Sequence, residues 1–535
     1  MENTYTKKWF QFDLARFRSF NREETEELIK VLSRCGYNGI GLYIEGFFEF
    51  PEFGGVPRIG CMTADDAKWV CEVAKQYNML VMPMTNLVGH GESFFCQERF
   101  TYLGRDDFQF DMKHEGFYSF AKSVIDQFID CFNPEIIHIG GDEVKLNEED
   151  RKDYVKFLSD MCVYLKEKGI ETGIWGDMFL THPEMAENMN KDVLVFDWWY
   201  YGHRYESTEM LRNAGFKNIV ISPATQSWDG IVGTQQMCPW KELMRWKCEE
   251  DVAGDEVEAF LIDAQKQGAY DAMLTDWENY RGHLIWNNLH VIARFGRYVN
   301  GKGLSDEELT QALFGRNTPY MECMHILMDA QKEHYRQYQK LPGFLVKHQH
   351  GTDGIFNCLA LCKLLQCGDL LGENLADIFN EAETKVKEII ADWKTESPLE
   401  DRCKRHLYFA ADYAKATAVT LRLASKTKAL YKQISYEQYR NPEKYSEMLH
   451  KVQADFTDFA NSYPDWIVSL ENAISDSGHT RRDIDEMKNV KALVEKLVIR
   501  LDDFDIDGVE YNKKLALPSW KALLCSVLGD IDVNK

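Results

Sequence analysis

A regular alternation of strand-like and helix-like segments dominates the first 300 residues of the chain. Short apolar, β-rich runs alternate with longer segments that have the apolar spacing of amphipathic helices. The strand-like runs span residues 9–14, 37–44, 79–84, 135–140, 170–175, 193–198, 218–223 and 270–275. The helix-like segments span residues 22–36, 63–77, 115–131, 147–169, 182–189, 204–215, 254–268 and 282–299.

This alternation predicts a protein of the α/β class, a (β/α)8 TIM barrel. Several of the strand-like runs are apolar throughout, which is typical of parallel strands that are covered on both faces. A doubly wound open sheet is the alternative. Its nucleotide-binding versions are disfavoured, because no G-x-G-x-x-G follows the first run and the sequence contains no P-loop motif.

The alternation stops after residue 300, and the rest of the chain has only helical periodicity. A serine followed by acidic residues predicts a helix over 304–315. We expect a barrel at 1–300, a helical connection at 301–350 and a mostly α-helical C-terminal domain at 351–535. Proline and glycine cluster in residues 340–354, which favours a boundary there.

Composition limits the partners and the compartment. The net charge of −24 argues against a nucleic-acid partner, because phosphate binding needs clustered Lys and Arg. No segment approaches the apolar length of a membrane span, and residues 1–17 lack the apolar core of a secretory signal. The 14 cysteines contain no CxxC pair, and Cys358, Cys362 and Cys367 have the spacing of one helix face. We therefore expect reduced thiols in a cytoplasmic protein without membrane contact.

Acidic and aromatic residues collect where the predicted strands end. In a barrel these ends share one face, where the chemistry of such folds is located. The residues at these ends are Asp13, Arg16, Glu45, His90, Glu92, Asp142, Glu143, Trp175, Asp177, Asp197, Trp198, Tyr200, Tyr201, Trp228, Asp229, Asp276, Trp277, Glu278 and Tyr280. Aromatic rings that stack on C–H faces and carboxylates that bond hydroxyls suit a sugar, whereas so many acids would repel a phosphate.

Each of these features also has a purely structural interpretation. Asp142 and Glu143 could belong to the first turn of a helix, where acids complement the helix dipole. The tryptophans could be ordinary core residues, and Arg16 could simply pair with Asp13. His138 lies inside a predicted strand and is expected to be structural. The convergence of many such residues on one face favours a common site.

The segment HIGGDEV, residues 138–144, resembles the signature of family 20 glycoside hydrolases, the β-N-acetylhexosaminidases. The segments FDLAR (12–16), PMTNLVGH (83–90), WGDMF (175–179) and TDWENY (275–280) resemble further parts of that family's barrel. The resemblance covers about residues 8–300, and the helical remainder is similar to bacterial members with an extra C-terminal helical domain.

The resemblance implies a retaining hydrolase in which the substrate's own 2-acetamido group attacks C1. Glu143 would be the general acid and then the general base. Asp142 would orient the acetamido group and stabilise the oxazolinium intermediate. A neighbouring carboxylate is also expected to raise the pKa of Glu143. This chemistry needs no metal and no cofactor.

The resemblance also assigns the surrounding residues. Arg16 would hold the O3 and O4 hydroxyls of the terminal sugar, which makes the enzyme exo-acting. His90 would support Glu143, with Glu45 as its own partner. Tryptophans would wall the pocket for the acetamido methyl group, with Asp177 nearby. These wall residues are Trp175, Trp198 and Trp277.

Two departures from the family pattern leave parts of the site open. Trp228 stands where the family has a tyrosine that bonds the acetamido carbonyl, and Tyr200 or Tyr201 could supply that hydroxyl instead. Asn279 stands where the family has an acid, so Glu278 or Asp276 could hold O4 and O6. The expected partner is a glycan or glycoconjugate with a terminal GlcNAc or GalNAc.

Two other classes of function compete with this one. A metal-dependent hydrolase could use His90 and His138 with nearby acids, and a sugar-binding protein could have the same barrel without turnover. The absence of an H-x-H pair after the first strand disfavours the former, and the intact Asp142–Glu143 pair disfavours the latter. A homodimer is a further expectation from the family resemblance.

Overall fold

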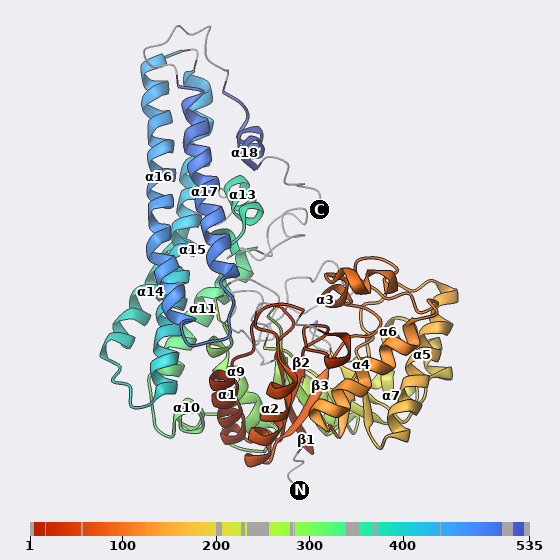
Figure 1. Cartoon of the computed structure of the whole chain (residues 1–535). Helices are drawn as coiled ribbons and strands as arrows, with labels where there is room; N and C mark the ends of the chain where they lie inside the picture. Colours follow the sequence, from red (N-terminus) through yellow and green to blue (C-terminus); the bar gives the residue numbers. More distant parts are fainter. Residues whose placement is uncertain are drawn as a thin grey trace.

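The computed structural model describes most of the chain in full-atom detail. The described residues are 5–16, 18–54, 57–198, 206–225, 231–232, 256–278, 282, 284–338, 353–367, 370, 373–438, 440–505 and 517–528. Figure 1 shows a barrel with a bundle of long helices beside it.

Eight parallel strands close into a barrel in sequence order. They are β1 (Lys7–Asp13), β2 (Gly39–Tyr43), β3 (Leu80–Met84), β4 (Ile136–His138), β5 (Glu171–Trp175), β6 (Leu194–Asp197), β7 (Asn218–Ile221) and β8 (Asp271–Asp276). Pairing of β1 with β8, in which Phe10 lies opposite Leu274, closes the ring. The predicted (β/α)8 barrel is confirmed, and the open-sheet alternative is wrong because this last pairing leaves no free edge.

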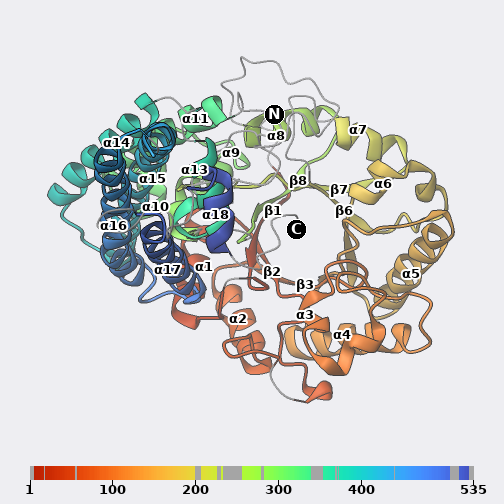
Figure 2. The same cartoon turned by 90° about the horizontal axis from the view of Figure 1, so that it is seen from above.

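Helices surround the ring of strands, as Figure 2 shows from above. They are α1 (Arg22–Cys35), α2 (Ala64–Gln76), α3 (Glu92–Phe95), α4 (Phe117–Phe132), α5 (Glu148–Glu167), α6 (Asp177–Thr181), α7 (Glu206–Asn213), α8 (Glu256–Lys266) and α9 (Leu289–Tyr298). Local sequence fixes several of their starts. Thr63 and Asp66 form a reciprocal capping box on α2, and the Asn147 side chain accepts from the N–H of Asp150 in α5.

One predicted helix has a different form. Residues 182–189 are not an α-helix. Pro183–Asn188 form a short 3-10 helix, η3, which follows the short α6 in the chain. Pro183 has no N–H to continue α6, and it holds His182 outside the helical region at φ −131° and ψ 71°.

The interior of the barrel is packed rather than hollow. Large side chains from several strands fill it, including Trp9, Met82, Met273 and Phe196, all less than about a tenth exposed. Trp9 stacks on Phe196 with ring centroids 6.2 Å apart. This packed core leaves the mouth of the barrel, where the strands end, as the place for polar side chains.

The described residues after the barrel are mostly helical, as predicted. Its helices are α10 (Asp306–Phe314), α11 (Tyr320–Tyr338), α13 (Cys358–Cys367), α14 (Glu373–Asp392), α15 (Pro398–Glu437), α16 (Pro442–Ala473), α17 (Arg482–Asp502) and α18 (Trp520–Leu528). The long helices α15, α16 and α17 stand beside one another next to the α1 side of the barrel (Figures 1 and 2).

The barrel helices and the C-terminal helices share one continuous cluster of buried apolar side chains. The guanidinium of Arg402 in α15 also lies 4.8 Å from the ring of Trp286, which is just before α9. The division into 1–300, 301–350 and 351–535 stays a prediction, and part of residues 340–354 lies outside the described residues. Among the described helices, none combines the length and the apolar character that crossing a bilayer requires.

Candidate active site

Two glycines turn the chain sharply after β4 and present two acids at the barrel mouth. Gly140 and Gly141 have φ values of +80° and +101°, which glycine adopts without strain. A Cβ on Gly140 would lie 2.0 Å from Oδ1 of Asn86, so no side chain fits there. Glu143 also has a positive φ of +53°. This turn, and not a helix start, places Asp142 and Glu143, because α5 begins only at Glu148.

Asp142 is held inside the mouth. Its carboxylate is buried, and Oδ1 accepts a hydrogen bond of 2.7 Å from Nδ2 of Asn86. Oδ1 of the same asparagine accepts from the N–H of Gly141 at 2.9 Å, so one side chain fixes both the turn and the acid. Burial raises the pKa of Asp142, and the nearby His90 opposes that rise.

Glu143 points to the opening and pairs with His90. Its side chain is 54% exposed, and Oε2 lies 3.1 Å from Nε2 of His90. Nε2 of His90 also lies 3.7 Å from Oδ2 of Asp142. Burial lowers the pKa of His90, but Asp142, Glu143 and Glu45 outweigh it and raise this pKa to about 9. The imidazole is therefore a cation at neutral pH.

The expected rise in the pKa of Glu143 is wrong for the free protein. The hydrogen bond to His90 lowers that pKa, and burial opposes the effect only in part. The acid whose pKa rises strongly is Asp177, at the start of α6. Burial and the neighbouring Asp142 raise its pKa to about 8. Oδ2 of Asp177 accepts from the N–H of Glu143 at 2.9 Å, so Asp177 supports the strained turn.

Arg16 lies across the mouth from these acids. Nη1 of Arg16 donates to Oδ2 of Asp13 at 2.8 Å, and its side chain stays 22% exposed. The guanidinium lies 5.1 Å from the ring centroids of both Tyr43 and Trp277. Glu45, buried just after β2, interacts electrostatically with both Arg16 and His90, and burial raises its pKa. The guanidinium has five N–H donors, so it has further donors beyond the one that contacts Asp13.

Aromatic side chains line the centre of the mouth. Trp175, at the end of β5, is fully buried, and its ring centroid lies 5.7 Å from that of Trp277. Trp277 meets Tyr43 edge to face at 5.0 Å. Trp198 is only partly buried and packs on this inner cluster. Nε1 of Trp175 is buried without a hydrogen-bond partner among the described residues.

His138 has the structural place predicted for it. It is fully buried inside β4, and Nδ1 accepts from the N–H of Gly140 at 3.1 Å. Burial lowers its pKa to about 3, so the ring is neutral. Its ring packs against Trp175 with centroids 4.4 Å apart.

Asp276, the last residue of β8, and Glu278, two residues later, both accept hydrogen bonds from protein groups. Oδ1 of Asp276 is buried and accepts from Oγ1 of Thr225 at 2.6 Å and from Nδ2 of Asn288 at 2.9 Å. Oε1 of Glu278 accepts from Nε of Arg18 at 2.8 Å, and both side chains are 1% exposed. This geometry favours structural roles over the predicted contacts with O4 and O6, because both carboxylates already have buried protein donors.

Three predicted site residues lie outside the described residues. They are Tyr200, Tyr201 and Trp228.

The structure adds residues that the motif analysis missed. Asn86 and Tyr43 contact Asp142 and Arg16, respectively. Both follow the strand-end rule, since Asn86 comes just after β3 and Tyr43 ends β2. Arg58 donates to the carbonyls of Leu14 and Arg18 at 2.8 and 2.7 Å and so holds the loop that carries Arg16. No local signal indicated Arg58, because it lies in a surface loop far from a strand end.

Asp142 and Glu143, together with His90, could also hold a cation. Among the residues that the structure describes, His90, Asp142 and Glu143 have ligand atoms within 4.8 Å of one another. These are the types of ligand that divalent metals accept.

Part of the chain matches a known family of glycosyl hydrolases. Residues 49–246 match the catalytic domain of glycosyl hydrolase family 20, a range that includes His90, Asp142, Glu143 and Trp175. A protein of Bifidobacterium bifidum described as lacto-N-biosidase is 26% identical over 163 residues. That match covers 26% of this chain and only 14% of the relative's length.

Two solved structures of β-N-acetylhexosaminidases are similar to part of this chain. The GH20 β-N-acetylhexosaminidase of Streptomyces coelicolor A3(2) is 15% identical, with a TM-score of 0.44, over 58% of this chain and 70% of that chain. The β-N-acetylhexosaminidase of Bacteroides fragilis is 18% identical, with a TM-score of 0.41, over 63% of this chain and 72% of that chain.

Proposed function

This chain carries a glycosyl hydrolase family 20 catalytic domain, and on that premise we propose that it is an exo-acting, retaining β-N-acetylhexosaminidase. One observation carries the proposal. The turn after β4 places a buried acid, Asp142, next to an exposed acid, Glu143, at the barrel mouth. A substrate-assisted mechanism needs this pair, because one acid must meet the acetamido group and the other the leaving oxygen.

In this mechanism Asp142 acts on the acetamido group. Its carboxylate accepts the acetamido N–H, which orients the carbonyl oxygen toward C1. As that oxygen bonds to C1, positive charge grows on the oxazolinium ring, and a buried carboxylate stabilises it strongly at low local dielectric. The hydrogen bond from Asn86 fixes the carboxylate before the reaction, so little reorganisation is needed.

Glu143 and His90 together supply the proton. Glu143 gives its proton to the leaving oxygen as the bond from C1 breaks, and later takes a proton from the water that opens the oxazolinium ring. The free protein holds one proton on this pair, on the imidazole. Transfer of that proton from Nε2 of His90 to Oε2 of Glu143, over the 3.1 Å contact, converts Glu143 into the acid. The attack by the acetamido group and then by water gives net retention.

Arg16 and the tryptophans would bind the terminal sugar. The exposed part of the guanidinium can donate to O3 and O4 at the non-reducing end, and a further sugar attached there would clash with it. Trp175 and Trp277 would enclose the acetamido methyl group. GlcNAc and GalNAc differ at O4, and we propose both as terminal residues of the substrate glycan.

The deciding experiment is hydrolysis of p-nitrophenyl β-GlcNAc and β-GalNAc by wild type, Asp142→Asn and Glu143→Gln. A thiazoline that mimics the oxazolinium ion is added as inhibitor. We expect turnover by wild type, tight inhibition, and a loss of about 100-fold or more in each variant. Glu148→Gln, in the exposed first turn of α5, is the matched control and should behave like wild type. An inert wild type, or variants with full activity, would refute the proposal.

The compartment and the assembly are also proposals. Ten of the described cysteines are free thiols, and several are buried, which supports a reducing compartment such as the cytoplasm. Cell fractionation tests this. The strong negative charge favours a protein without a nucleic-acid partner, which a gel-shift assay tests. A homodimer stays a prediction, and light scattering at several concentrations tests it.

A further inference from the structure

The turn between α16 and α17 contacts the barrel loop that carries Arg16. The N–H of Ser19 donates to the carbonyl of Gly478 at 2.6 Å, and the N–H of Gly478 donates to Oε2 of Glu24 at 2.7 Å. Arg18 and His479 form an isolated antiparallel bridge at the same place. A Cβ on Gly478 would lie 2.0 Å from the carbonyl oxygen of Ser19, so only glycine allows this approach.

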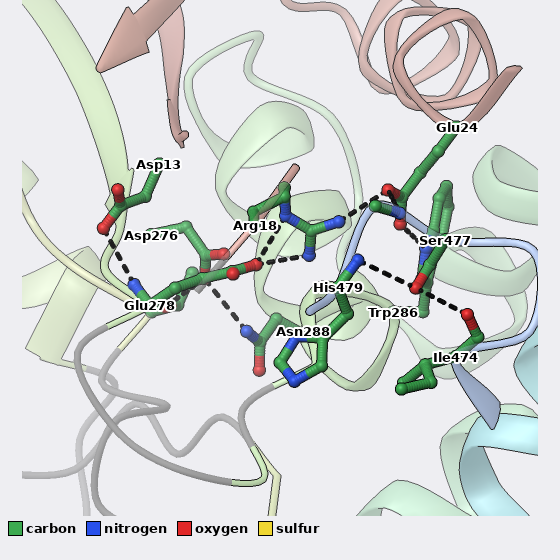
Figure 3. A network of polar contacts seen from close by, with 12 residues as sticks. Asp13, Arg18, Glu24, Asp276, Glu278, Trp286, Asn288, Ile474, Ser477 and His479 are labelled. Atoms are coloured by element: carbon green, nitrogen blue, oxygen red, sulfur yellow. Dashed lines mark hydrogen bonds and ion pairs between the residues drawn. The ribbon is translucent and has the colours of Figure 1, made fainter. Parts of the chain in front are cut away.

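Glu24 joins this contact to a buried ion triad, which Figure 3 shows. Arg18 lies between Glu24 and Glu278, and each of the three side chains is 1% exposed. Nη1 of Arg18 donates to Oε2 of Glu24 at 2.6 Å, and Nε donates to Oε1 of Glu278 at 2.8 Å. Nε1 of Trp286 donates to Oε1 of Glu24 at 2.8 Å. Buried charges depend on such partners, so the loss of one donor disturbs the whole group.

The triad continues to Arg16. The N–H of Glu278 donates to Oδ2 of Asp13 at 3.1 Å, and Nη1 of Arg16 donates to the same oxygen at 2.8 Å. A chain of hydrogen bonds therefore runs from Gly478 through Glu24, Arg18, Glu278 and Asp13 to Arg16. Figure 3 shows its central part, with Arg18 between Glu24 and Glu278.

A second contact joins α17 to the segment after β8. Oδ2 of Asp483, in the first turn of α17, accepts from the N–H of Gly282 at 2.6 Å and lies 3.1 Å from Nε2 of His479. Asp483 is 1% exposed. The helical region thus contacts both the loop after β1 and the segment after β8, the two places that supply Arg16 and Trp277.

From these contacts we propose that the α16–α17 turn is a positioning element of the active site. It fixes the Arg16 guanidinium through Arg18 and Glu278, and so the C-terminal helices help to set the affinity for the terminal sugar. Arg18, Glu24 and Gly478 are positioning residues, since the structure gives them no place at the barrel mouth. The inference rests on the proposed function in so far as Arg16 binds the sugar hydroxyls.

The test compares Gly478→Ala with wild type on p-nitrophenyl β-GlcNAc and on its 4-deoxy analogue. In wild type, removal of O4 should lower kcat/KM by about 10- to 100-fold, because it removes charge-assisted hydrogen bonds. In Gly478→Ala the parent substrate should show a raised KM, and removal of O4 should cost less than about threefold. Ser475→Ala, exposed in the same turn, is the control.

Circular dichroism and thermal unfolding show whether Gly478→Ala is folded. If it is not, Glu24→Gln is the second variant. It keeps the shape of the side chain, but it removes the negative charge and replaces one of the two acceptor oxygens by an NH2 donor, which weakens the ion triad. A folded variant that retains the full wild-type penalty for loss of O4 would overturn the inference.

Hydrogen–deuterium exchange separates this inference from the proposed function. Gly478→Ala should raise exchange in the peptide covering residues 10–20, while the peptide covering residues 136–146 stays unchanged. If wild type is inert on both sugars, the proposed function fails and the exchange result alone decides the inference. Unchanged exchange at residues 10–20 would then refute it.

Discussion

The proton shared by Glu143 and His90 gives a testable pH dependence. The raised pKa of His90, about 9, means that the pair keeps its proton until the solution is well above neutral pH. The value of kcat/KM reports ionisations of the free enzyme, so its basic limb should lie near pH 9. An isolated carboxyl acid would instead lose activity about five units lower.

Replacing His90 by Gln removes the shared cation. Glu143 then loses the hydrogen bond that lowers its pKa, while burial still raises that pKa. The catalytic proton is then held by a carboxyl group alone. We expect its pKa to lie above that of Glu143 in wild type but well below the pKa of about 9 that His90 has, so at pH 7 most of the enzyme has lost the catalytic proton. The basic limb of kcat/KM should therefore move down from about pH 9 to below pH 7, with a loss of about tenfold or more at pH 7 relative to the variant's own acid plateau.

The assay is the full pH profile of kcat/KM with p-nitrophenyl β-GlcNAc. His325→Gln is the matched control, because His325 also pairs with an acid, Asp306, at 3.0 Å, but on the exposed surface outside the barrel mouth. Its profile should match wild type. A basic limb that stays near pH 9 in His90→Gln would refute the shared-proton argument.

The same raised pKa predicts an effect on stability. The pKa of His90 is about 9 in the folded protein against an ordinary 6.5, so its contribution is fully present below pH 6.5 and is lost as the pH rises through about 9. The difference corresponds to about 3 kcal/mol. Wild type should lose this stability between those pH values in urea unfolding, and His90→Gln should not.

Further predictions concern the groups around the acids and the metal question. Asp177 keeps its proton up to about pH 8 when folded, whereas the unfolded chain releases it near 3.8, so stability falls as the pH rises between these values. Asp177→Asn should therefore melt at a higher temperature than wild type at pH 8.5 and at the same temperature at pH 4; an equal difference at both values would contradict this. Asn86→Ala removes the 2.7 Å bond to Asp142 and should lower kcat by about tenfold, so an unchanged kcat would show that Asp142 needs no such support. Dialysis against EDTA should leave turnover unchanged, whereas a loss that zinc restores would favour a metal-dependent hydrolase at the His90 cluster.

The sequence predicted the scaffold because its signals are local. Eight apolar runs with intervening amphipathic segments specify parallel strands and covering helices, and all eight strands form close to the expected residues. The strand-end rule then brought Asp142, His90, Arg16 and Trp277 to one face, since the carboxyl ends of barrel strands always share a side. The exception, residues 182–189, depended on Pro183 ending α6, which apolar periodicity does not register.

Contacts between distant parts of the chain could not be predicted in this way. Glu278 looked like a sugar ligand at a strand end, yet it pairs with Arg18, 260 residues earlier. Gly478 looked like an ordinary turn residue, yet it lies on the loop that carries Arg16. No periodic pattern records such pairs, because they arise only when separate elements have packed together.

The sequence by itself therefore determined the barrel, the helical region and the pair of acids after β4. Propensity, periodicity and turn chemistry act over a few residues, and the printed chain contains them in full. Only the tertiary structure decided the protonation of those acids and the partners of Arg18 and Glu278. Electrostatic and hydrogen-bond energies depend on distances of a few ångströms and on burial, and both are set by packing of residues that lie far apart in the chain.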